Sequence, residues 1–272
     1  MPKAGQKPHP HMSRAFANAY EQAATRITGP VSCAALDRLG PIGRAARIID
    51  IAAGTGAFSI PAAHRGAAVT ATDVAPGMVA LLAERLRPFP QARASVMDGQ
   101  ALDFPDGSFD AAVSIFGISL FPNWRLGLSE QVRVLRPGGK AVLATWRHPP
   151  GGGPFVIMAE ALRATFPDQP PPAPPSGFVE LAEPEAMDAA LVACGLVETS
   201  AEEIEAVWEG PAGTAYLEEL RDFHPFMGPY AQLGPDLRRK LDEAILEAVD
   251  RRSANGRLVM TTKVTIGVGT KS

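Results

Sequence analysis

The chain has 272 residues, of which 46% are hydrophobic and 20% are charged, and its formal net charge is −3. This balance is typical of a globular protein that buries a substantial core, and it lacks the basic excess that nucleic-acid-binding domains carry. Two cysteines are too few for a disulfide framework, and alanine-rich surroundings predict buried thiols at Cys33 and Cys194. Because the sequence contains neither a signal-peptide pattern nor an apolar run of membrane-spanning length, we expect a cytoplasmic protein.

The start of the chain predicts a tail followed by two helices. Residues 1–12 are polar and proline-rich, which predicts disorder. Apolar residues then recur at helical spacing from Ser13 to Ile27, and Ser13 suits the N-cap position. We expect the Gly29-Pro30 pair to end this helix, since proline lacks the amide hydrogen that a helix interior needs, and a second short helix to span Ser32–Leu39.

From Arg47 onward, short apolar strands alternate with amphipathic helices. One helix should follow the glycine loop after the first strand, and two more should span Pro76–Arg87 and Trp124–Leu135. This alternation predicts a Rossmann-like α/β fold, whose mostly parallel sheet is covered by helices on both faces. Five strands are predicted here, at Arg47–Ile51, Ala68–Asp73, Ala92–Met97, Asp110–Phe116 and Lys140–Trp146.

Beyond Trp146 the regular alternation stops. Residues 149–181 are rich in proline and glycine and are equally well interpreted as a linker or as an irregular lid. A helix over Pro184–Cys194 and strands at Glu198–Val207 and Leu258–Val268 would complete a seven-stranded sheet. The sequence thus predicts a core at 13–148, an insertion at 149–181 and a C-terminal part at 182–272, in which about 211–255 form a helical cap.

The strongest local signal is the stretch Ile48–Gly56, in which a strand leads through a glycine turn into a helix. Gly54 and Gly56 allow a sharp turn and the close approach of a ligand. A dinucleotide-binding loop would need a third glycine at position 59, where this chain has Ser59. A P-loop is excluded as well, because Gly139-Lys140 is followed by Ala141 rather than by serine or threonine. The loop alone therefore leaves both a ligand site and a plain tight connection open.

Acidic residues stand at the ends of three successive predicted strands. Asp73 lies about 20 residues after Gly54, where a nucleoside-binding fold accepts hydrogen bonds from ribose hydroxyls. Asp98, followed by Gly99, could accept the exocyclic amine of an adenine, and Asp50 ends the first strand. Carboxylates repel phosphate, so the set favours a cationic adenosine cofactor over a pyrophosphate.

These motifs, with Leu102–Asp110 and Val134–Lys140, resemble the class I S-adenosylmethionine-dependent methyltransferases. The motifs are most similar to those of the methyltransferase type 11 group, which includes quinone-biosynthesis enzymes. The resemblance covers roughly residues 44–147 and departs from the family at Ala52, where glycine is common. It implies that S-adenosylmethionine is the cofactor and that a small molecule accepts its methyl group.

The family's cofactor contacts can be carried over residue by residue. The loop would hold the methionine part, Asp50 its ammonium through water, and Asp73 the ribose, while other residues would lie beside the adenine or at the methyl-donor end. Tyr20 would close over the cofactor, unless it belongs to the helix core. The implied cofactor residues are Tyr20, Asp50, Ala52, Gly54, Gly56, Asp73, Val74, Met78, Asp98, Gly99, Gln100, Ser114 and Ile115.

The chemistry of the acceptor is less determined by the sequence. An activated sulfonium needs mainly alignment and exclusion of water, but a hydroxyl acceptor also needs a base, for which His148 and His224 are candidates. A structural or surface role is the simpler interpretation of both histidines. Aromatic and methionine side chains of the two insertions either pack a cap or line an apolar acceptor pocket: Phe155, Phe166, Phe178, Tyr216, Phe223, Phe226, Met227 and Tyr230.

We therefore expect O- or N-methylation of an apolar or aromatic metabolite of the kind found in secondary metabolism. A protein that binds S-adenosylmethionine without catalysis is an alternative, and a nicotinamide-dependent oxidoreductase is a second one that Ser59 disfavours. No metal site, nucleic-acid partner or membrane span is expected, and the sequence leaves a homodimer open.

Overall fold

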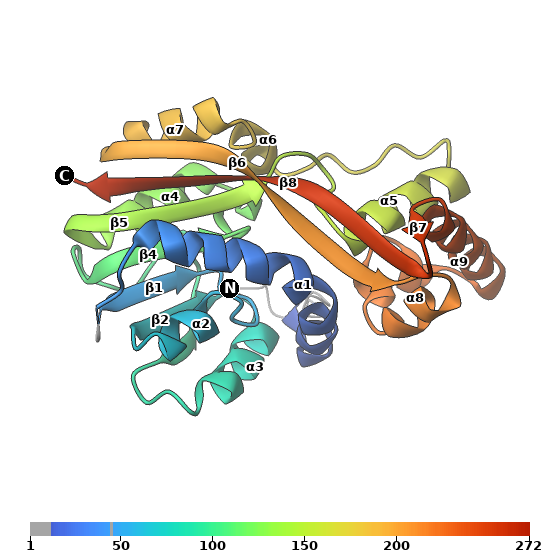
Figure 1. The fold of residues 1–272 in the computed structure, drawn as a ribbon, viewed down its shortest axis with the longest axis horizontal. Coiled ribbons are helices and arrows are strands. Elements are labelled where there is room, and N and C mark those ends of the chain that lie inside the picture. Colours follow the sequence, from blue (N-terminus) through green and yellow to red (C-terminus); the bar gives the residue numbers. More distant parts are fainter. Residues whose placement is uncertain (1–11, 44–45) are drawn as a thin grey trace, which may run out of the picture.

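The computed structural model describes residues 12–43 and 46–272 (Figure 1). The predicted disordered tail therefore lies outside the described residues, apart from Met12. Within the described ranges, no helix is long and apolar enough to cross a membrane.

A single twisted sheet forms the centre of the molecule. Its strand order is β3-β2-β1-β4-β5-β8-β6, with the short β7 paired to β8. The first five strands are parallel, whereas β8 runs antiparallel to both β5 and β6. The predicted seven-stranded, mostly parallel, Rossmann-like sheet is confirmed. The strands are β1 (Arg47–Ile51), β2 (Ala68–Asp73), β3 (Arg93–Val96), β4 (Phe109–Ile115), β5 (Leu135–Trp146), β6 (Leu196–Pro211), β7 (Ser253–Ala254) and β8 (Arg257–Lys271).

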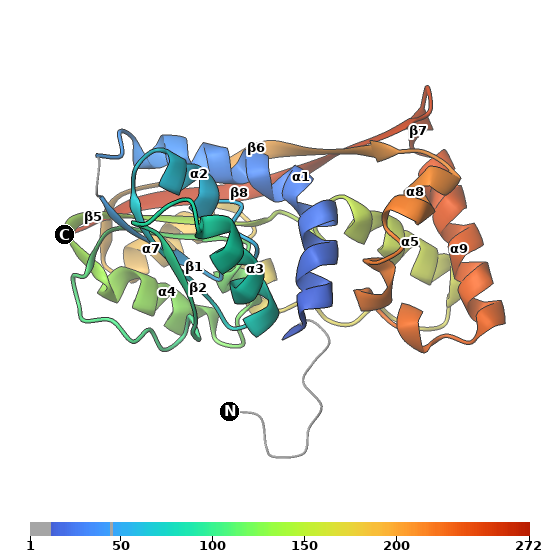
Figure 2. The ribbon, with the colours of Figure 1, turned by 90° about the horizontal axis from the view of Figure 1, so that it is seen from below.

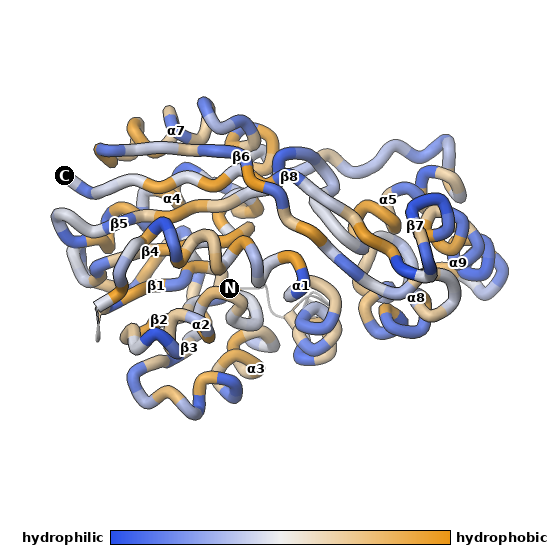
Figure 3. Tube along the Cα trace, in the orientation of Figure 1, coloured by the Kyte–Doolittle hydropathy of each residue, from blue (hydrophilic) through white to orange (hydrophobic). Residues whose placement is uncertain are grey.

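Helices cover both faces of this sheet because its central strands are apolar on both sides. On β1, Ile48 packs into one buried cluster, and Ile49 and Ile51 pack into another. This alternation follows from the two-residue period of a strand. Figure 3 shows hydrophobic residues gathered along β4 and β5, whereas the edge strand β6 carries many hydrophilic ones. One face is covered by α1 (Arg14–Leu39), α2 (Ser59–His64) and α3 (Pro76–Leu86), and the other by α4 (Trp124–Arg133) and α7 (Pro184–Ala193).

The N-terminal segment differs from its prediction. It is one helix, α1, that continues through Pro30, so the prediction of two helices was wrong. Ile27 and Val31, which lie before and after Pro30, are both buried, and their packing holds the two halves of α1 in one helix. Proline removes one helical hydrogen bond and bends the axis, and Figure 2 shows α1 changing direction along its length. Ser13 caps the helix as predicted, accepting a hydrogen bond from the Phe16 amide.

Both cysteines are more accessible than the composition of their surroundings predicts. Cys33 is exposed and Cys194 is only partly buried. Cys33 follows the buried Ser32 on α1 and therefore lies on the outward side of that helix. The prediction of two buried thiols was wrong because an alanine-rich sequence does not say which side of a helix faces the core.

A helical lobe lies at one end of the molecule, where the long strands β6 and β8 extend beyond the rest of the sheet (Figures 1 and 2). Its main helices are α5, which belongs to the segment 149–181, and α9, which packs against it. An ion pair between Glu160 and Arg251 joins the two helices. The lobe and its connections contain α5 (Pro154–Thr165), α6 (Ser176–Glu180), α8 (Thr214–Glu219), α9 (Pro235–Asp250) and the 3-10 turns η3 (His224–Phe226) and η4 (Tyr230–Gln232).

Candidate cofactor and acceptor site

The glycine loop connects β1 to α2 at the carboxyl edge of the sheet. Gly54 and Gly56 have φ angles of +55° and +96°, in the left-handed region that glycine tolerates. A Cβ on Gly56 would lie 2.3 Å from Leu82 Cδ1, so the loop passes directly against α3. A Cβ on Gly54 would lie 3.9 Å from Tyr20 Cε1, which places the Tyr20 ring beside the loop. Backbone conformation and the approach of α3 explain both glycines.

Ala52 has a left-handed backbone, with φ at +58°. This conformation strains any residue that has a Cβ, which gives a physical reason for the glycine that the family commonly has here. The Cβ of Ala52 packs close to Gly117 beyond β4, where an added Cβ would lie 2.5 Å from it. The loops after β1 and β4 are therefore in tight contact, and the strained turn is fixed from both sides.

Asp50 and Ser59 form a buried polar pair beneath this loop. Ser59 Oγ donates a 2.6 Å hydrogen bond to Asp50 Oδ2, and only 2% of Asp50 is exposed. Burial raises the pKa of the Asp50 carboxyl to about 7, the hydrogen bond from Ser59 opposes this rise, and the negative charge of Asp73 adds to it. A carboxyl so placed is poised to ionise when a cation comes within contact distance.

Asp73 connects the end of β2 to the glycine loop. Its two carboxylate oxygens accept hydrogen bonds from the backbone amides of Gly54, at 2.9 Å, and of Ala75, at 2.8 Å. Burial raises the pKa of Asp73, and these backbone hydrogen bonds oppose that effect. Each carboxylate oxygen has a second lone pair, so Asp73 keeps the capacity to accept hydrogen bonds from a ribose diol.

The residues predicted beside the adenine divide into exposed and packed ones. Val74 is 53% exposed although it directly follows the buried Asp73. Met78, in contrast, is buried in a small apolar cluster between α1 and α3. Asp98 is exposed, and it accepts hydrogen bonds from the backbone and the side-chain amide of Gln100. The exposed pair of Val74 and Asp98 is therefore available to a ligand, whereas Met78 is not.

Gly99 and Ser114 have packing roles that sequence reasoning did not identify. A Cβ on Gly99 would lie 2.6 Å from Phe121 Cζ, so the space beside this glycine is filled by protein. The fully buried Ser114 donates a hydrogen bond to the Ile51 carbonyl and accepts one from the Ile118 amide. Ser114 thus joins the ends of β1 and β4, and it is its neighbour Ile115 that reaches the cavity described next.

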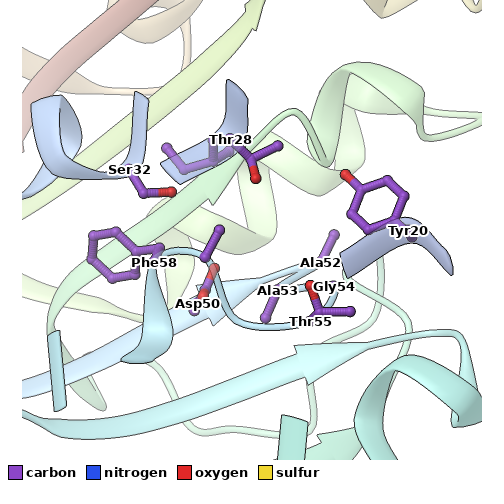
Figure 4. Close-up of a pocket in the computed structure, with 11 residues that line it drawn as sticks. Tyr20, Thr28, Ser32, Asp50, Ala52, Ala53, Gly54, Thr55 and Phe58 are labelled. Carbon is purple, nitrogen blue, oxygen red and sulfur yellow. The ribbon is translucent and has the colours of Figure 1, made fainter. Parts of the chain in front are cut away.

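A cavity of about 30 Å³ lies between α1 and the glycine loop (Figure 4). Asp50, Ala52, Gly54, Tyr20 and Ile115, five of the residues carried over from the family, are brought together in its wall. Sequence reasoning missed two of its polar members, Thr28 and Ser32 on α1; their spacing of four residues was the available signal. The lining residues are Tyr20, Thr28, Ser32, Asp50, Ala52, Ala53, Gly54, Thr55, Ala57, Phe58 and Ile115.

An aromatic cluster connects this cavity to the helical lobe. The centroid of the Tyr20 ring lies 5.7 Å from that of Phe16 and 6.4 Å from that of Phe223. Phe223 in turn packs edge-on against Phe155 of α5, and Phe16 against Phe226 of η3. Apolar rings therefore extend without interruption from the glycine loop to the lobe.

Two ion pairs hold the first half of α1 against α3. Arg14 forms two hydrogen bonds with Glu84, at 2.9 and 2.7 Å. Arg85 pairs with Glu21 of α1 at 2.7 Å and also donates to the Thr55 carbonyl in the glycine loop. The position of Tyr20 over the loop is thereby coupled to the loop itself.

The comparisons with known proteins agree with this geometry. Residues 48–139 match a methyltransferase domain family. Over 139 residues the chain is 38% identical to demethylmenaquinone methyltransferase of Renibacterium salmoninarum, a match covering 50% of this chain and 57% of that protein. Over 241 residues it is 30% identical to an uncharacterized protein of Mycobacterium tuberculosis, covering 84% and 81% of the two chains. The chain belongs to the class I S-adenosylmethionine-dependent methyltransferases.

The fold agrees with this assignment. The structure of phosphoethanolamine N-methyltransferase 2 from Haemonchus contortus, in complex with phosphomonomethylethanolamine and S-adenosylhomocysteine, aligns with a TM-score of 0.59 at 18% identity. The alignment covers 96% of this chain and 58% of that chain. The chain spans about half the length of the demethylmenaquinone methyltransferases that it matches.

The charge of the cavity wall fits the cofactor of the family. S-adenosylmethionine carries positive charge on its sulfonium and on its ammonium group. Asp50 lines the cavity and Asp73 lies behind it, whereas no lysine or arginine is among the lining residues that the structure describes. A buried carboxyl without a nearby cation is the electrostatic complement of a cationic ligand.

The two candidate bases predicted from the sequence lie outside this cavity wall. His224 is 2% exposed, its ring is 5.9 Å from Tyr216 and 5.5 Å from Tyr230, and burial lowers its pKa to about 4. His148 is exposed just beyond β5. The structure therefore places neither histidine in the wall of this cavity.

Proposed function

We propose that this protein transfers the methyl group of S-adenosylmethionine to an oxygen or nitrogen atom of an apolar or aromatic small molecule. The observation that supports the acceptor class is the position of Tyr20, which belongs both to the wall of the cavity at the glycine loop and to the aromatic cluster of the lobe. An acceptor beside Tyr20 would meet apolar rings on its way to the loop.

The cofactor supplies an activated methyl group, so the chain has to bind, orient and exclude water. In our proposal Asp73 accepts hydrogen bonds from the ribose hydroxyls, and Asp98, with Gln100 beside it, accepts one from the adenine amine. Val74, half exposed after a buried strand end, would cover one face of the adenine. Residues 52–56 would hold the methionine part against the backbone of the loop.

The acceptor would pack against the cluster formed by Phe16, Phe155, Phe223 and Phe226. Apolar contact favours a planar or hydrophobic molecule and removes water from the sulfonium. The demethylmenaquinone methyltransferases among the relatives make quinone-like aromatics the first acceptors to test. Where the acceptor has to lose a proton, His148 and His224 stay the proposed bases; the low pKa of His224 keeps it in the neutral, proton-accepting form at pH 7.

The test is a methyl-transfer assay with a hydroquinone acceptor and, as the polar alternative, phosphoethanolamine. Phe223→Leu and Phe155→Leu should lower kcat/KM for the apolar acceptor by about tenfold, as expected for loss of ring contacts, with unchanged affinity for S-adenosylhomocysteine. Phe109→Leu is the matched control for Phe223→Leu, because Phe109 is also buried but packs in the cluster on the other face of the sheet.

Three results would contradict the proposal. Turnover of phosphoethanolamine alone would overturn the acceptor class. Binding of S-adenosylmethionine without turnover of any acceptor would favour the non-catalytic binder. Binding of NAD(H) in its place would favour the oxidoreductase. A cytoplasmic location and the absence of nucleic-acid partners stay predictions from the sequence, which leaves a homodimer open.

A further inference from the structure

The cavity between α1 and the glycine loop contains a buried hydroxyl that no protein atom satisfies. Ser32 is fully buried, and its Oγ has no hydrogen-bond partner. Leaving a buried polar atom unpaired costs free energy, so such atoms are rare unless a ligand or water completes them. Because Ser32 lines the cavity, a polar group placed there would satisfy it.

Two further oxygen-bearing side chains face the same space. Thr28 lies one helical turn before Ser32, so both hydroxyls are on one side of α1. In Figure 4 these two side chains descend from α1, while Asp50 approaches from β1 on the opposite side. Thr28 Oγ1 already donates its hydrogen to the Ala24 carbonyl, which leaves its lone pairs free to accept.

The size, polarity and charge of this space suit an ammonium group. A primary ammonium has three N–H donors, and Thr28, Ser32 and Asp50 offer one acceptor each. The cavity, at about 30 Å³, has room for a small polar group. Asp50 supplies the one carboxyl among the lining residues of the described part of the chain, and none of those lining residues is cationic.

We propose that Thr28 and Ser32, together with Asp50, form the site for the α-ammonium group of the cofactor, which makes the second half of α1 part of the cofactor-binding surface. This inference rests on the proposed function. Neither hydroxyl is assigned a role by the motifs at 48–139, since both precede them in the chain. The bend at Pro30, between the two hydroxyls, lies within this segment of α1.

Calorimetry with two ligands tests the proposal. One is S-adenosylhomocysteine, and the other is its desamino analogue, which keeps the adenosine, sulfur and carboxylate but lacks the ammonium. Ser32→Ala should weaken binding of S-adenosylhomocysteine about tenfold, the effect of losing a hydrogen bond to a charged group, and should leave the analogue unchanged. Thr28→Val, which keeps the shape and removes the hydroxyl, should behave in the same way.

Ser119→Ala is the matched control, because Ser119 is also fully buried and unpartnered but does not line this cavity. It should change neither affinity. Thermal unfolding of each variant identifies any that fails to fold, and Thr28→Val then provides an independent test of the same site.

Equal weakening of both ligands by Ser32→Ala would overturn the proposal, because it would show a structural effect of the hydroxyl. Unchanged binding of both ligands would overturn it as well, and would mean that the cavity holds only water. Failure of the wild-type protein to bind S-adenosylhomocysteine would instead refute the proposed function, so the two failures are distinguishable.

Discussion

Ser59 Oγ and Asp50 Oδ2 lie 2.6 Å apart in the interior, joined by a hydrogen bond that spans the glycine loop from the first residue of α2 back to β1. Ser59 stands where a dinucleotide-binding loop would have its third glycine. A glycine there could not donate to the carboxyl. The residue that departs from the nicotinamide pattern is therefore the same one that supports a buried acid suited to a cationic cofactor.

The pH dependence of stability should reveal the buried Asp50. Its pKa of about 7 in the folded state exceeds its usual 3.8 because burial disfavours the charged form. The proton is thus bound more tightly by the folded chain, and the resulting stabilisation is complete below about pH 4 and is lost as the pH rises through 7. Asp50→Asn, which cannot ionise, should unfold at a higher temperature than wild type at pH 8 and at a similar temperature near pH 4.

The same variant should bind S-adenosylhomocysteine at least tenfold more weakly, since it loses a charged acceptor. Tm measured between pH 4 and pH 9, with the affinity at pH 8, checks both effects. A Tm difference that does not vary with pH would show that Asp50 titrates normally in the folded protein.

His224 should have the opposite pH signature. Burial lowers its pKa from 6.5 to about 4, so the folded chain favours the neutral ring. Its contribution to stability is present above pH 6.5 and is lost as the pH falls through 4. His224→Gln should therefore flatten the decline of the unfolding free energy between pH 6.5 and pH 4, as measured by urea titration. The exposed His148→Gln is the control, and an equal effect of both substitutions would contradict the prediction.

Substitution by glycine should change the stability of the fold in opposite directions at two neighbouring alanines of the glycine loop. Ala52 is held at φ +58°, so Ala52→Gly relieves strain and should stabilise the fold by about 0.5–1 kcal/mol. Ala53 does not have a positive φ, and Ala53→Gly should destabilise it by about 0.5–1 kcal/mol because the unfolded chain gains freedom. Urea unfolding measures both values; a shift of the same sign in both variants would rule out strain at Ala52.

Asp73→Ala should weaken binding of S-adenosylhomocysteine at least tenfold, because the ribose loses its charged acceptor and the amides of Gly54 and Ala75 lose theirs. Asp98→Ala should have a smaller effect, because Asp98 is exposed and water can replace it. Calorimetry on both variants measures the two losses of affinity and checks that the loss in Asp73→Ala is the larger. Unchanged affinity in Asp73→Ala would mean that the ribose lies elsewhere.

Much of the core followed from local patterns in the sequence. The strands β1 and β2 match their predicted bounds, because an apolar run closed by an acid before a turn is a short-range signal. The carboxyl ends of parallel strands meet at one edge of a sheet, so the predicted topology already placed Asp50 and Asp73 together. Ser13 capped its helix as expected for the same reason: the cap depends on the amide three residues later.

Contacts between distant segments decided the rest. Pro30 did not end α1, because burial of Ile27 and Val31 against the sheet outweighs one lost hydrogen bond, and no local pattern measures that burial. Gly99 and Ser114 proved to be packing residues, because Phe121 and Ile51 reach them from other parts of the chain. Likewise, only the packing of α1 on the sheet brings Ser32 opposite Asp50. The sequence by itself determined the sheet and the acids at its edge; the tertiary structure decided what covers them, since helix packing depends on residues far apart in the chain.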